Sequence, residues 1–216
     1  MSVNLTAANG KFQANKIKSE KCSLQLLDGD IEIATYLEAM NITVKQNDGK
    51  IKIKRLSVSG IAQITQRRGS IKIGSLYTNV FANKKESTAQ LNQEESSESK
   101  TFPIQIAKES ETIKRRLDKH ENVVRIHAME SQDIEIDFSH GYLSVESENV
   151  LNLTIRRMKN EQLYVRAREG TISLYLVELK RDSYIKLERG GKLTIRIEQE
   201  IFNANIYDIS RKTYIF

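Results

Sequence analysis

The sequence is poor in the residues that cross-link or interrupt a protein chain. Its 216 residues include one cysteine, one proline and no tryptophan. A single cysteine excludes an intramolecular disulfide framework and a zinc site made of cysteines. The scarcity of proline excludes collagen-like and proline-rich stalk architectures. No stretch approaches the run of about eighteen apolar residues that a membrane-spanning helix needs, so none is predicted.

The residues that are present fit a water-soluble protein with a substantial core. Hydrophobic residues make up 39% of the chain and charged residues 29%, proportions that exclude a disordered chain and an integral membrane protein. Isoleucine occurs 25 times and alanine 12 times, which favours strands over helices. The first 27 residues contain one acid and no apolar core of a secretory signal. Strand-like alternation begins by about Lys11, so we expect this segment to be structural.

A repeat of twenty residues is the strongest signal in the sequence. The segment Asp28–Ile33 recurs as Asp48–Ile53 and as Arg68–Ile73, with glycine at the second position and isoleucine at the fourth and sixth. Other positions recur with the same period, and each set predicts a column of side chains with one residue from each repeat unit. The three further columns are Leu24, Val44 and Ile64; Cys22, Ile42 and Ala62; and Tyr36, Leu56 and Leu76.

This period predicts a solenoid. Alternating apolar and polar residues leave one strand face buried and the other wet, yet one unit of this length cannot bury its apolar face alone. Units stacked in register can do so, and a glycine at each corner permits the sharp turn. The predicted fold class is all-β, a parallel β-solenoid with about 20 residues per coil. The expected turn glycines are Gly29, Gly49, Gly69, Gly170 and Gly191.

A long insertion interrupts the repeat. We expect N-terminal solenoid coils over residues 1–81, an insertion over residues 82–122, and C-terminal coils of the same domain over residues 123–216.

Three stretches of the insertion predict different structures. Ser87–Ser99 has three acids and no base, which predicts a disordered acidic loop. Phe102–Ile106 alternates like a strand, with its proline near the start. Lys108–Glu121 fits a short surface helix, because Ile113 and Leu117 lie four residues apart.

The repeat units resemble a known family. Gly29–Val44, Gly49–Ile64 and Gly69–Phe81 are similar to the adhesin-domain family, the head-type β-solenoid repeats of bacterial auto-transporters, and Arg68–Tyr77 looks especially like its eukaryotic relatives. The resemblance implies a solenoid without a catalytic motif. Because the eukaryotic relatives are associated with mitochondria, it also implies a mitochondrial location.

No constellation of residues predicts catalysis, a metal or a cofactor, and we expect a protein that is not an enzyme. In register, Asp30 is followed by Lys50 and Ser70, so carboxylates do not stack as a calcium site requires. The three histidines lack a ligand spacing such as H-E-x-x-H, and His127 is expected to be an exposed strand residue. Cys22 shares a column with apolar residues, which predicts a buried and inert thiol.

Charge and aromatic residues indicate where partners could bind. Lys45–Lys72 carries eight basic residues and one acid, which suits an acidic partner, a phosphate backbone, an anionic membrane surface or a merely solvated face. Six of the eight tyrosines lie in the C-terminal part, where they suit strand packing, a protein interface or nucleic-acid stacking. An open solenoid end needs a cover, from the insertion or, as we favour, from another subunit. The predicted partner-binding residues are Lys52, Arg55, Arg67, Arg68, Lys72, Tyr207, Tyr214 and Phe216.

These observations favour a rigid, non-catalytic accessory subunit that docks onto other protein subunits of a larger assembly and has no small-molecule substrate. Two alternatives stay open. A carbohydrate-binding or adhesion module would be secreted and glycosylated at Asn41, whose side chain is expected to face outward opposite Ile42. A nucleic-acid-binding accessory protein would use the basic residues of Lys45–Lys72.

Overall fold

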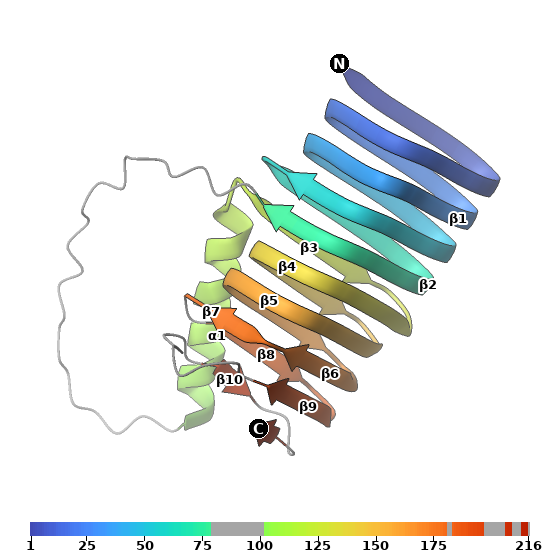
Figure 1. Cartoon of the computed structure of the whole chain (residues 1–216). Helices are drawn as coiled ribbons and strands as arrows, with labels where there is room; N and C mark the ends of the chain where they lie inside the picture. Colours follow the sequence, from blue (N-terminus) through green and yellow to red (C-terminus); the bar gives the residue numbers. More distant parts are fainter. Residues whose placement is uncertain (79–101, 181–182, 197–205, 209–212, 216) are drawn as a thin grey trace, which may run out of the picture.

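The strands of this chain wind into a single parallel β-solenoid, which confirms the predicted fold class (Figure 1). The computed structural model describes residues 1–78, 102–180, 183–196, 206–208 and 213–215. The acidic segment Ser87–Ser99, for which the sequence predicts a disordered loop, lies outside the described residues.

The elements follow one another around and along the solenoid axis. Strand β1 passes around the corners without interruption and so makes up several coils (Figure 1). In chain order the elements are β1 (Ser2–Val58), β2 (Ile61–Thr78), α1 (Phe102–Lys119), β3 (Val123–Ala128), β4 (Gln132–Ser147), β5 (Val150–Ala167), β6 (Glu169–Tyr175), β7 (Val177–Leu179), β8 (Ser183–Leu187), β9 (Gly191–Arg196), β10 (Ile206–Asp208) and β11 (Thr213–Ile215).

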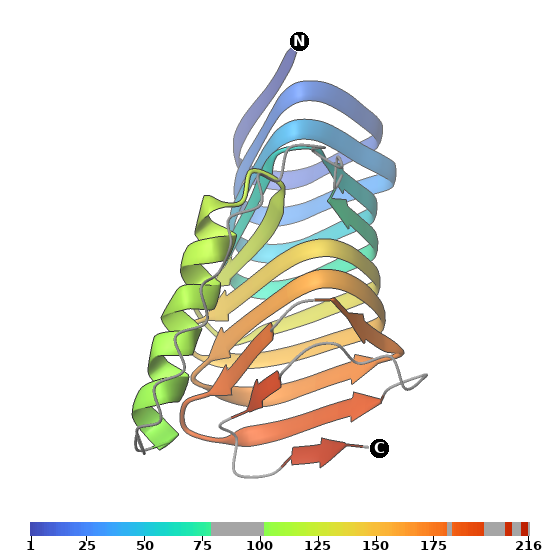
Figure 2. The same cartoon turned by 90° about the vertical axis from the view of Figure 1, so that its left-hand side faces the viewer.

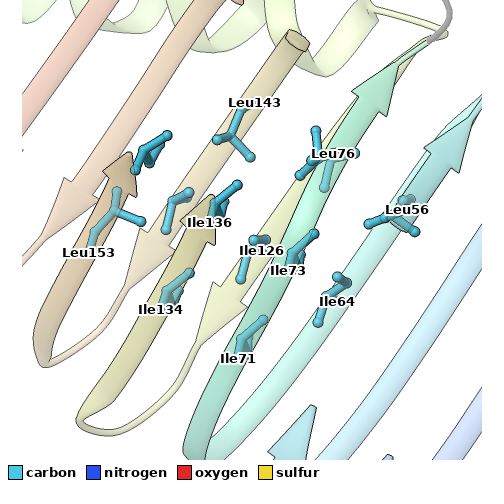
Figure 3. Packing of buried hydrophobic residues seen from close by; sticks show 14 of the residues in the cluster. Leu56, Ile64, Ile71, Ile73, Leu76, Ile126, Ile134, Ile136, Leu143 and Leu153 are labelled. Atoms are coloured by element: carbon cyan, nitrogen blue, oxygen red, sulfur yellow. The ribbon is translucent and has the colours of Figure 1, made fainter. Parts of the chain in front are cut away.

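The core consists of apolar side chains stacked from coil to coil. Ile51 of β1 pairs with Ile71 of β2, which pairs with Ile134 of β4 and then with Leu153 of β5. Each of these four side chains is at most 1% exposed, and Figure 3 shows three of them on adjacent strands. Removing this apolar surface from water is the main stabilising contribution of each added coil.

The insertion leaves the stacking of coils unbroken. Strand β2 pairs with both β3 and β4, and Gly69 of β2 lies opposite Gln132 of β4. The coil before the insertion therefore lies directly against the coil after it, as the sequence predicts for one interrupted solenoid.

Helix α1 confirms the predicted helix in the insertion but begins earlier than expected. It starts at Phe102, so the prediction of strand character over Phe102–Ile106 is wrong. A run of five residues with two isoleucines fits both the strand period and the helix period. Such a run is too short for its length to decide between strand and helix.

Helix α1 covers a flank of the coils rather than an end of the solenoid (Figure 2). Its Ile113 and Leu117 are 3% and 1% exposed and belong to a cluster with buried tyrosines of β4, β5 and β8. The guanidinium of Arg125 on β3 donates to the carbonyl oxygens of Leu117 (2.9 Å) and Asp118 (3.0 Å), which satisfies carbonyls at the helix end.

The column predicted from Tyr36, Leu56 and Leu76 is wrong at Tyr36. Tyr36 is half-buried, and Leu37 occupies the core position with no exposed surface. Ile33 and Ile53 are twenty residues apart, whereas the buried Leu37 and Leu56 are nineteen apart. One extra residue at the corner between Ile33 and Leu37 therefore turns Tyr36 outward, which a strict period of twenty cannot reveal.

The corner glycines are required for both conformation and space. All five predicted turn glycines adopt positive φ. At Gly49, φ is +134°, and a Cβ would lie 1.7 Å from the carbonyl oxygen of Gly29 in the preceding coil. Gly10 has nearly the same φ, +126°, but a Cβ there would meet nothing within 4 Å.

Substitution of these two glycines separates the two requirements. Gly10→Ala should lower the free energy of unfolding by about 1–3 kcal/mol, the cost of a side chain in a backbone region that glycine alone adopts readily. Gly49→Ala adds a collision with backbone and should cost at least about 4 kcal/mol. Urea unfolding followed by circular dichroism measures both losses, and equal losses would show that close coil stacking does not constrain the corner.

Candidate functional site

The predicted basic residues lie on outward faces of β1 and β2, where acids of neighbouring coils meet them. Lys52 Nζ lies 3.2 Å from Glu32 Oε1 in the coil before it. Lys72 Nζ lies 2.9 Å from Glu135 Oε2, in the coil that follows the insertion. Lys52 and Lys72 are direct neighbours in the pairing register, and each turns to an acid on the side away from the other.

The two arginines at the corner are paired in the same way. Arg68 binds Asp48 with two hydrogen bonds, Nε to Oδ1 at 2.7 Å and Nη2 to Oδ2 at 2.9 Å. Arg67 Nε donates to Glu130 Oε1 at 2.8 Å. The contact between Arg68 and Asp48 raises the pKa of the Arg68 guanidinium and holds the pKa of the Asp48 carboxyl below its usual range. Hydrogen bonding between the two side chains is the largest cause of both shifts. Exposed pairs of this kind contribute little individually, but here they join coils.

The other cations of the same stretch lie in different surroundings. The guanidinium of Arg55 lies over the ring of Tyr77, 4.9 Å from its centroid. The structure shows no ion pair between described residues for Lys45, Lys50 and Lys54, which are all exposed. The cations without acidic neighbours are thus largely different from those that the sequence singles out.

Three of the tyrosines with described side chains are packing residues. Tyr142, Tyr164 and Tyr184 are 2% to 3% exposed and lie beneath α1. The rings of Tyr164 and Tyr184 stack with centroids 5.4 Å apart. For these three residues the sequence left strand packing, a protein interface and nucleic-acid stacking open, and burial under α1 favours packing.

The predicted contacts at the C-terminal edge are described only in their backbone. Tyr207 of β10 pairs with Tyr184 of β8, and Tyr214 of β11 pairs with Thr194 of β9. Phe216 lies outside the described residues.

Residues with catalytic or ligating side chains are scattered. No group of three or more His, Cys, Asp or Glu residues that could hold a metal ion occurs among the described residues. His127 is partly exposed on its strand, 3.3 Å from Glu148. Cys22 is 2% exposed, as predicted, and burial raises the pKa of its thiol. None of the described helices is long and apolar enough to span a bilayer.

The glycosylation motif at Asn41 is engaged within the fold. Asn41 is half-buried, and its Oδ1 accepts a hydrogen bond from the backbone N–H of Ile61 at 3.3 Å. The side chain faces away from the buried Ile42, as expected, and it bridges to the next coil.

An apolar groove of about 480 Å³ follows one corner of the N-terminal coils. Ala7 and Ala8 of the first coil line it together with Leu27, Lys45 and Met129. Leu27 is 53% exposed and Met129 40%, in a structure that buries most of its large apolar side chains.

Sequence reasoning missed this groove, although a signal exists. The positions twenty and forty residues after Leu27 are polar, Asn47 and Arg67. A leucine at an outward position that is polar in the next two coils has no role in the core, and this difference within the repeat marks Leu27.

No family model, no curated protein and no solved structure matches this chain. The resemblance to the adhesin-domain family stays a prediction from the repeat pattern.

Glu32 is a carboxylate that takes part in more than one of the charge pairs between coils. Glu32 accepts hydrogen bonds from Gln13 Nε2 at 2.8 Å and Lys52 Nζ at 3.2 Å, and Lys11 Nζ lies 3.1 Å from it. These contacts, Gln13 first, hold the pKa of Glu32 at about 2. Because the folded-state pKa lies below the ordinary value of 4.5, the stabilisation is complete above pH 4.5 and is lost as pH falls toward 2.

The stability of wild type relative to Glu32→Gln should therefore decrease between pH 4.5 and pH 2. Thermal unfolding midpoints of both proteins across this range measure the difference. Glu169→Gln is the matched control, because Glu169 is exposed and the structure shows no ion pair for it with a described residue. A constant difference between wild type and Glu32→Gln would contradict the cited contacts.

Proposed function

We propose that this protein is a rigid, non-catalytic scaffold subunit that docks onto other protein subunits of a larger assembly. The observation that carries the proposal is the corner groove with the exposed side chains of Leu27 and Met129. Apolar side chains that lie together on a surface are stabilised when an apolar face of a partner removes them from water.

A ladder of buried amides supports the groove from inside. Gln66 Nε2 donates to Gln46 Oε1 at 2.6 Å and to the carbonyl of Gly49 at 2.9 Å, and Gln132 donates in turn to Gln66. All three glutamines are at most 3% exposed, and Gln46 also lines the groove. Because these bonds connect successive coils, the groove keeps its shape without a partner, which lowers the entropic cost of binding.

The two alternative functions draw less support from the same surface. Binding to a phosphate backbone needs available cations, and acids of adjacent coils pair with half of the eight basic residues in Lys45–Lys72. Asn41, the glycan site of the adhesion hypothesis, is half-buried and hydrogen-bonded. A mitochondrial location of the assembly is supported by the family resemblance alone.

A pair of exposed apolar residues at different corners tests the docking function. Leu27 and Met40 are 53% and 47% exposed, and only Leu27 lines the groove. Leu27→Asp should release the protein from its assembly, because it places a charge in the apolar contact. Met40→Asp makes the same chemical change outside the groove and should leave the assembly intact.

The measurement is size-exclusion chromatography and native mass spectrometry of the tagged protein, expressed at its natural level in its own cells. Wild type and Met40→Asp should elute with a stoichiometric partner, and Leu27→Asp as the free 24.8 kDa chain. A wild-type protein that elutes free, or two variants that behave alike, would overturn the proposal.

A further inference from the structure

Asn160 of β5 is an amide buried inside the solenoid. It has no exposed surface, and neither its Nδ2 nor its Oδ1 has a hydrogen-bond partner among the described residues. Nearly all buried polar atoms of folded proteins do have a partner, which is either a protein group or an ordered water. The two atoms of this amide therefore point to a ligand that belongs to the folded protein.

The neighbouring coils do not supply the partner. In the strand register, Asn160 lies between Gly141 of β4 and Leu179 of β7, neither of which has a polar side chain. The buried glutamines that support the corner groove differ in this respect, because Gln46 and Gln66 are register neighbours and bond directly to each other. Asn160 therefore has no ladder of amides to join.

A second buried polar atom without a partner lies on the adjacent coil. Ser139 of β4 has no exposed surface, and its Oγ has no hydrogen-bond partner among the described residues. Ser139 pairs with Met158, two positions before Asn160 on β5. Because two positions along a strand return to the same face, Ser139 and Asn160 are diagonal neighbours in the interior, with Cα atoms roughly 8 Å apart. Water can bridge two polar groups that do not bond directly.

The surroundings of this pair leave a small space that is closed to solvent. In its column, Ser139 stands between Leu76 and Met158, two larger side chains that have no exposed surface. Gly141, beside Asn160, contributes no side chain. Thr78 bounds the space on one side, because its Oγ1 lies where a Cβ of Gly141 would be. The place between the two polar residues therefore suits a molecule as small as water.

We propose that an internal water molecule binds between Ser139 and Asn160 and joins β4 to β5 inside the solenoid. Water both donates and accepts hydrogen bonds, which matches a site made of an amide N–H, an amide oxygen and a hydroxyl. A metal cation does not fit, because it takes more oxygen ligands, usually with carboxylates among them. Between these coils the water does what glutamine side chains do between earlier coils, and its binding does not depend on a docking partner.

The ¹⁷O relaxation dispersion of water detects water molecules held inside a dissolved protein, and Asn160→Leu is the variant that tests this site. It replaces the amide by an apolar side chain of similar shape, so the amplitude of the dispersion should fall by the contribution of at least one water molecule. Met158→Leu is the matched control, because it conserves volume and keeps both polar residues, and its amplitude should equal that of the wild type. The signal follows the water oxygen, so proton exchange of the Ser139 hydroxyl cannot imitate it.

A measurement on the wild-type protein keeps the test independent of variant folding. Water-selective NOE spectra of the ¹⁵N-labelled protein should show a cross-peak between water and the Nδ2 hydrogens of Asn160. The Nε2 hydrogens of Gln66 should show none, because they bond to Gln46 and to the carbonyl of Gly49. Equal amplitudes for wild type and Asn160→Leu, an equal fall in both variants, or the absence of the Asn160 cross-peak from the wild type would overturn the proposal.

Discussion

Direct contact between the backbone of one coil and the backbone of the next is the constraint on which the rest of this structure depends. At the corner, the carbonyl of Gly29 occupies the space where a Cβ of Gly49 would lie. The same closeness lets Gln46 and Gln66 share a hydrogen bond in the interior. Since every coil must reproduce the path of its neighbour, one misplaced side chain at a corner disturbs all the columns that pass through it.

This stacking also determines the electrostatics of the surface. Neighbouring strands lie about 4.8 Å apart, so like charges in one column repel unless each has an acid on its other side. Lys52 and Lys72 satisfy this condition, with Glu32 above one and Glu135 below the other. Half of the eight basic residues in Lys45–Lys72 are therefore paired with acids of other coils, and the cations that stay exposed without an ion pair among the described residues are Lys45, Lys50, Lys54 and Arg55.

Helix α1 divides the solenoid into a covered and an open part. Its apolar side chains bury the tyrosines of β4, β5 and β8 (Figure 2), and Lys114 pairs with Glu146 at 2.9 Å. An outward face that bears tyrosine would otherwise be apolar and exposed. The helix leaves the first coils uncovered (Figure 2), and these coils carry the exposed side chain of Leu27.

The sequence by itself determined the period, the corner glycines and the burial of Cys22, because each coil repeats the last and a column can be read at a fixed interval. Only the tertiary structure decided which cations are neutralised, since the partner of Lys72 is 63 positions away, beyond the insertion. It also decided the position of α1 and the outward turn of Tyr36. These features depend on which coil follows which and on single-residue changes in coil length, and a repeat pattern specifies neither.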